Sequence, residues 1–69
     1  MDKRELIGEL KRVNEYYGEK AEAAFERGDR EEGLDYGHMA DAHGEAAKAL
    51  ERGEDPEYVN NRWNGILDF

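Results

Sequence analysis

Three side chains near the middle of the sequence could together ligate a metal ion. His38, Asp41 and Glu45 are three and four residues apart, so a helix would present them on one side. Imidazole and carboxylate groups suit borderline and hard divalent metals. A bridged two-metal site needs a second acid-x-x-His pair, and the chain has only Asp35 with His38. We therefore expect a solvated charged face and no cofactor, with a metal site at these residues as an alternative.

Nucleophilic catalysis lacks its usual residues, because the chain contains no serine, threonine or cysteine. The eight glycines form no phosphate-binding loop, since no G-x-G-x-x-G or P-loop pattern occurs. With 69 residues the chain can form one small domain, which offers little enclosed volume for a substrate. We therefore predict a protein that is not an enzyme.

Acidic residues outnumber basic residues by 18 to 10, which gives a net charge of −8. This excess opposes direct binding to nucleic acids, whose phosphates are bound through lysine and arginine. We predict instead that Glu31, Glu32 and Asp35 occupy a basic site on another protein. Small phage-type inhibitors of nucleic-acid machinery have this character. Ordinary solubility is the alternative explanation of the acidic cluster.

Residues 58–69 hold the only tryptophan and many of the large apolar residues. Packing of a third helix on the rest of the chain is the simpler explanation. Docking on another subunit or on a foreign partner is the alternative, and its contact residues would be Tyr58 and Trp63, because such rings are enriched at binding hot spots.

A different function is an oligomer that binds a small molecule or a nucleotide between its subunits. Aromatic rings and cationic side chains would hold an aromatic or anionic ligand. The candidate residues are Tyr16, Tyr17 and Tyr36 with Arg12, Lys20 or Arg30.

Apolar residues recur at helical spacing, and no useful stretch alternates with period two, so we predict an all-α fold. We expect helices over about 3–27, 30–52 and 56–67 in a single domain of residues 1–69. The first two form an antiparallel hairpin, and the third is short.

The helix ends are marked by a repeated pattern, since Phe-Glu-Arg-Gly-Asp ending at Asp29 is echoed by Leu-Glu-Arg-Gly-Glu ending at Glu54. Gly28 and Gly53 are expected just past the helix ends, in the left-handed conformation. Asp29 is expected to cap the second helix, and Asp55, followed by proline, to cap the third.

The turn from Arg27 to Leu34, with Tyr17 before it and Ala40 after it, resembles the junction between the helices of a tetratricopeptide repeat. Gly33 stands where that family usually has alanine, and one copy cannot build a repeat array. The resemblance implies a helix–turn–helix and no peptide-binding function.

The position of the turn sets which residues of the long helices face each other. Counting outward from it places Gly44 against Val13 or Asn14, and Asn14 beside His43. We expect a buried hydrogen bond between Asn14 and His43 that fixes the register, with a ligand-binding or catalytic role as the alternative. A glycine inside a helix costs about 1 kcal/mol relative to alanine. We therefore expect close approach of the facing helix to offset Gly37 and Gly44.

A hairpin of two long helices cannot bury its own apolar residues, and the chain is poor in aliphatic residues. We therefore predict a homo-oligomer with a helical-bundle core. The apolar residues expected to stay open in one copy are Ile7, Phe25, Tyr36, Met39 and Leu50.

No stretch approaches the roughly 18 apolar residues of a membrane span. The first residues lack the apolar core of a signal peptide. We therefore expect a soluble, cytoplasmic protein with no membrane partner.

Overall fold

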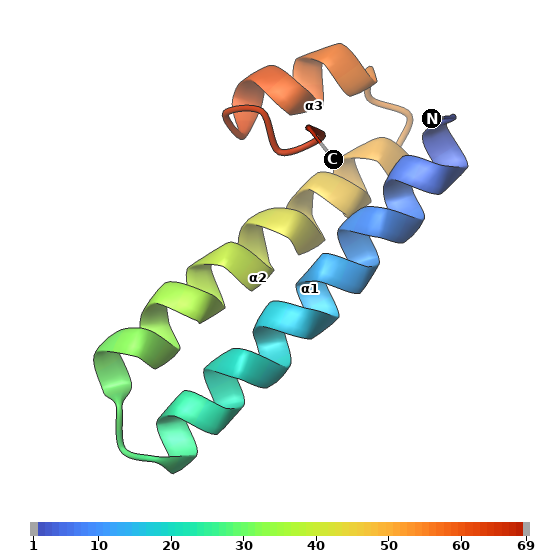
Figure 1. Ribbon diagram of the computed structural model, residues 1–69. Helices are drawn as coiled ribbons and strands as arrows, with labels where there is room; N and C mark the ends of the chain where they lie inside the picture. The colour runs from blue at the N-terminus through green and yellow to red at the C-terminus, as the bar shows by residue number, and fades with distance from the viewer. Residues whose placement is uncertain (1, 69) are drawn as a thin grey trace.

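The computed structural model describes residues 2–68, which form three α-helices and no β-strand. Helix α1 spans Lys3–Glu26, α2 spans Arg30–Glu51 and α3 spans Pro56–Arg62. The two long helices pack antiparallel, and α3 lies against the end of the hairpin that holds the N-terminus (Figure 1). The predicted all-α hairpin with a short third helix is confirmed.

An aspartate caps the N-terminus of each helix. The carboxylates of Asp2, Asp29 and Asp55 accept hydrogen bonds from backbone amides two or three residues further along the chain, at 2.9 to 3.1 Å. Each bond satisfies an amide that has no partner within its helix. The predicted caps at Asp29 and Asp55 are confirmed.

Gly28 and Gly53 end the long helices with φ angles of 81° and 100°, as predicted. After each glycine, the amide of the next residue donates to a carbonyl five residues earlier, from Asp29 to Ala24 and from Glu54 to Ala49. The repeated sequence therefore produces the same helix termination twice.

The third helix is shorter than the predicted range 56–67, because it ends at Arg62. Asn64 and Gly65 both adopt positive φ angles, 54° and 83°, which a continuing helix cannot accommodate. The side-chain oxygen of Asn60 then accepts a hydrogen bond from the Leu67 amide at 2.8 Å. This bond holds residues 63–68, here called the tail, folded back toward the hairpin.

The predicted register of the hairpin is confirmed at two positions along its length. A Cβ atom added to Gly44 would lie 2.9 Å from Asn14 Nδ2, and one added to Gly33 would lie 2.7 Å from the Phe25 ring. At Gly44 and Gly33, a side chain of α1 therefore lies close against the backbone of α2.

Two details of the predicted hairpin are wrong. Asn14 does not pair with His43, because Asn14 Nδ2 donates to the Ala40 carbonyl at 2.6 Å and His43 Nδ1 to the Met39 carbonyl at 2.7 Å. Gly37 is not under a close neighbour, since a Cβ atom there would meet nothing within 4 Å.

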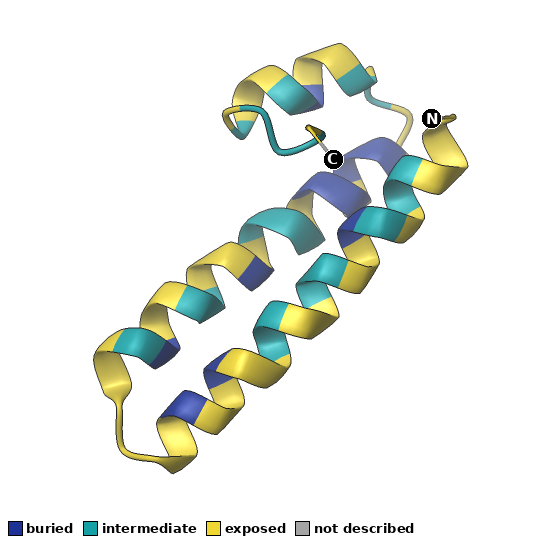
Figure 2. Cartoon of the chain, viewed as in Figure 1, coloured by how far each residue is buried: buried dark blue, intermediate teal, exposed yellow. Residues whose placement is uncertain are grey.

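The core lies at the α3 end of the hairpin, where the buried positions of α2 are most continuous (Figure 2). Leu10, Leu50 and Val59 are its largest fully buried side chains. Leu50 is therefore not among the open apolar residues, because α3 covers it. Phe25 and Met39 do stay open, with 48% and 43% of their surfaces exposed.

Candidate functional site

A groove of about 550 Å³ lies between the hairpin and the tail. Its walls come from α1, α2 and the tail, and they are mostly apolar. The side of the hairpin that carries this groove is called the α3 face here. Its main lining residues are Val13, Tyr17, Met39, His43, Trp63 and Ile66.

Tyr17 is the centre of an aromatic cluster on the α3 face. Its ring lies 5.9 Å from the ring of Tyr36, nearly parallel at 23°, and 5.9 Å from the ring of His43. Tyr16 packs edge-on against Tyr17 at 5.2 Å, and Lys20 Nζ lies 5.5 Å from the Tyr16 ring. Such contacts hold the rings in fixed positions beside the groove.

The sequence places these rings together through helical spacing. Tyr36, Met39 and His43 are three and four residues apart, so they share one side of α2. The hairpin register then brings Tyr17 of α1 beside them. Because α3 covers only the far part of this side, Tyr16 remains 54% exposed and Met39 43% exposed.

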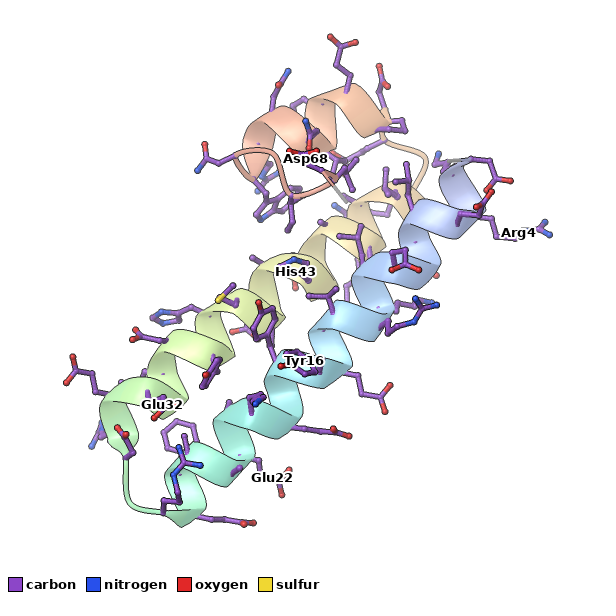
Figure 3. The ribbon with its side chains drawn as sticks, viewed as in Figure 1. Arg4, Tyr16, Glu22, Glu32, His43 and Asp68 are labelled. Carbon is purple, nitrogen blue, oxygen red and sulfur yellow. The ribbon has the colours of Figure 1, made fainter. Side chains whose placement is uncertain are left out.

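Glu32 and Asp35 continue the α3 face toward the hairpin turn. Glu32 lies one helical turn before Tyr36, and Asp35 one turn before Met39. Asp35 is exposed. Glu32, labelled in Figure 3, is half-buried. Its carboxylate forms an ion pair with Arg27 at 3.1 Å. The α3 face therefore carries two carboxylates between the groove and the hairpin turn.

Asp29 adds a stable negative charge at the turn. The hydrogen bond from the Glu32 amide lowers the pKa of the Asp29 carboxyl below its usual value, and the nearby Arg27 guanidinium acts in the same direction. The carboxylate form is thereby favoured.

The predicted partner-binding residues divide into two groups. Trp63 lines the groove, with the Arg62 guanidinium 4.7 Å above its ring, and Glu32 and Asp35 share its side of the hairpin. Tyr58 is 52% exposed on α3 and does not line the groove. Glu31 is exposed and lies on a different side of α2 from Tyr36.

The side chains of the alternative metal site are not brought together. Within residues 2–68, no three His, Asp or Glu side chains gather in a way that could hold a metal ion. His38, Asp41 and Glu45 are all exposed, and Glu45 pairs instead with Lys48 at 3.7 Å.

The residues proposed for small-ligand binding are partly brought together. Tyr16, Tyr17 and Tyr36 form the cluster, with Lys20 beside it. Arg12 pairs with Glu9, and Arg30 lines a separate hollow near the turn.

The sequence-based prediction missed the groove walls at Met39, His43 and Ile66. The spacing of Tyr36, Met39 and His43 was a usable signal for one side of α2. No such signal indicated Ile66, because its place in the groove depends on the tail folding back at Asn64 and Gly65.

No protein-family model matches the chain, and no characterised protein or solved structure is significantly similar to it. Among the described helices, none is both long and apolar enough to cross a membrane.

Proposed function

We propose that this chain is a non-enzymatic binding protein whose α3 face takes up a basic, partly apolar segment of another protein. The observation that carries the proposal is the open apolar groove beside fixed aromatic rings, with Glu32 and Asp35 beyond its end. Exposed aromatic and methionine side chains next to charge are typical of interface centres and their rims.

The two parts of the face have different roles in this proposal. A large apolar side chain of the partner enters the groove between Met39 and Trp63, where burial of apolar surface supplies the affinity. A lysine or arginine of the same segment lies near Glu32 and Asp35. The net charge of −8 attracts such a segment before contact and speeds its association.

The aromatic cluster favours a second candidate function, the binding of an aromatic anion. A flat ligand could stack beside Tyr17 and Tyr36 while Lys20 neutralises its charge. The acidic surroundings weigh against this candidate, because they repel a second negative charge.

A selection of displayed random peptides on the immobilised protein tests the first proposal. We expect enriched peptides to combine lysine or arginine with a large apolar residue. Calorimetry with one such peptide then compares the wild type with a double variant, Glu32→Gln and Asp35→Asn. The variant should bind more weakly at low salt and approach the wild type at high salt, since exposed charges are screened by ions.

The matched control is the double variant Glu5→Gln and Glu19→Gln. It removes the same charge, and Glu5, like Glu32, lies in the first turn of a long helix. Equal weakening by both variants would show that only the total charge matters. Enrichment of acidic peptides, or of none, would exclude the proposal, and binding of an aromatic anion instead would favour the second candidate.

A further inference from the structure

The hairpin has a second surface, on the other side of the crease between α1 and α2, which α3 does not cover. Three shallow hollows follow one another along it. We call this surface the glycine face, because Gly18, Gly37 and Gly44 lie along the crease there. It is defined by the lining residues Ile7, Lys11, Gly44, Phe25, Arg30 and Leu34.

The two ends of the glycine face have opposite shapes. Near the hairpin turn, Phe25 and Leu34 protrude, with 48% and 45% of their surfaces exposed. At the other end, a hollow of about 560 Å³ is lined by Ile7 and Leu50 together with charged side chains. The protruding side chains at one end are therefore complementary in shape to the hollow at the other end.

The two ends also have opposite charges. Lys3, Arg4, Lys11 and Lys48 line the hollows at the α3 end, where the acids Glu15 and Glu51 are fewer. Toward the turn, Glu22 lies on the same side of α1 and Glu26 beside it. Arg30 of α2 is the basic residue that lines the hollow there, so the acids outnumber it by two to one. Arg4 and Glu22 lie near opposite ends of α1 (Figure 3).

We propose that the glycine face binds the glycine face of a second copy of this chain, in an antiparallel dimer with two-fold symmetry. Such symmetry places the basic end of each copy on the acidic end of the other. Phe25 of each copy enters the hollow that Ile7 lines in the other, and Leu34 lies against the exposed side chains at the same end of α2.

One symmetry axis satisfies the contacts on both helices. On α1, Ile7 facing Phe25 and Lys11 facing Glu22 are both centred near Tyr16. On α2, Leu34 facing the exposed Lys48 and Glu51 is centred near Ala42. Because Asn14 lies beside Gly44, Tyr16 and Ala42 lie at the same level of the hairpin. The same axis therefore crosses both helices.

The size of the face and its glycines fit this dimer. The molecule extends 39 Å along its longest axis and 20 Å across, a rectangle of about 780 Å² that is the upper limit for a flat face. A standard interface takes about 800 Å² from each partner. Cβ atoms at Gly18 and Gly37 would meet nothing within 4 Å in one copy. The absence of side chains at Gly18 and Gly37 would let the backbone of a second copy approach closely.

Charge reversal across the interface tests the proposal. Sedimentation of the wild type should show a mass of twice 7.9 kDa at micromolar concentration. Lys11→Glu and Glu22→Lys should each raise the dimer dissociation constant about tenfold or more, because each places like charges opposite each other. An equimolar mixture of the two variants should form heterodimers, since every facing pair is then opposite in charge.

Two controls separate this interface from general effects of charge and apolar surface. Lys11→Glu removes an ion pair within the chain, that of Lys11 with Glu51 at 3.1 Å. Arg12→Glu likewise breaks one ion pair of α1, that with Glu9, but lies off the glycine face and should leave the dimer intact. Leu34→Glu should dissociate the dimer, whereas Met39→Glu, equally exposed on the α3 face, should not. Circular dichroism verifies that each variant remains helical.

A monomeric wild type, or a dimer that the single reversals do not weaken, would overturn the proposal. Failure of the mixed reversals to associate would do the same. These results are independent of peptide binding on the α3 face, which the dimer leaves uncovered on both copies.

Discussion

A Cβ atom on Gly44 would lie 2.9 Å from Asn14 Nδ2, the atom that donates to the Ala40 carbonyl. The glycine and the asparagine therefore depend on each other. Asn14 has room to cross the crease because residue 44 has no side chain, and its hydrogen bond ties α1 to α2 halfway along the hairpin.

Replacing Gly44 with leucine should destabilise the protein by about 1 to 3 kcal/mol, because the new side chain displaces Asn14 and overpacks the crease. The gain in helix propensity, below about 1 kcal/mol, does not offset this cost. Urea unfolding followed by circular dichroism measures the difference. Gly8→Leu is the control: residue 8 is exposed with nothing within 4 Å, so that variant should be slightly more stable. A Gly44→Leu variant more stable than the wild type would contradict the observed packing.

The cap at Asp29 should make stability depend on pH in a defined direction. Because the pKa of Asp29 is lowered in the folded protein, its ionised form contributes fully above the ordinary pKa of aspartate, about 4. That contribution is lost as the pH falls through the lowered value. Asp29→Asn keeps the side-chain acceptor but has no charge to lose. Its melting temperature should lie below that of the wild type at neutral pH, and the difference should shrink in acid.

Thermal melts at several pH values measure this difference, with Glu19→Gln as the control for the loss of one exposed negative charge. A difference between Asp29→Asn and the wild type that grows as the pH falls would have the wrong sign for a lowered pKa.

The tail should be released by a change at Gly65. Its φ angle of 83° is strained for any residue with a Cβ atom, so Gly65→Ala should disfavour the folded-back tail by about 1 to 2 kcal/mol. Trp63, the only tryptophan, reports on this segment, and its fluorescence emission should shift to longer wavelength. The helical circular dichroism signal should change little. Unchanged emission would show that other contacts hold the tail.

Local signals in the sequence were sufficient for the ends of the two long helices and for the hairpin. Aspartate and glycine at the turns act through their own neighbours, so Gly28 and Asp29 could be interpreted without the rest of the chain. The register followed, because a tight turn determines which residues of two helices face each other.

The surfaces were harder to predict, because helical spacing gives the side of a helix only approximately. Gly37 and Gly44 share a stripe, yet only Gly44 lies under a facing side chain. The groove depends on contacts between distant residues, such as Asn60 with Leu67, which no periodic pattern indicates. The apolar spacing of residues 58–67 also concealed the turn at Asn64 and Gly65.

The uneven placement of the core has a consequence for hydrogen exchange. All three of the largest fully buried side chains lie at the α3 end, whereas the turn end is held mainly by Ala21, Ala24 and Gly33. Backbone amides near the turn are therefore released by small local openings, while those around Leu10 and Leu50 exchange only through larger ones. The hairpin thus has a gradient of protection along its length, with its acidic end the first to open.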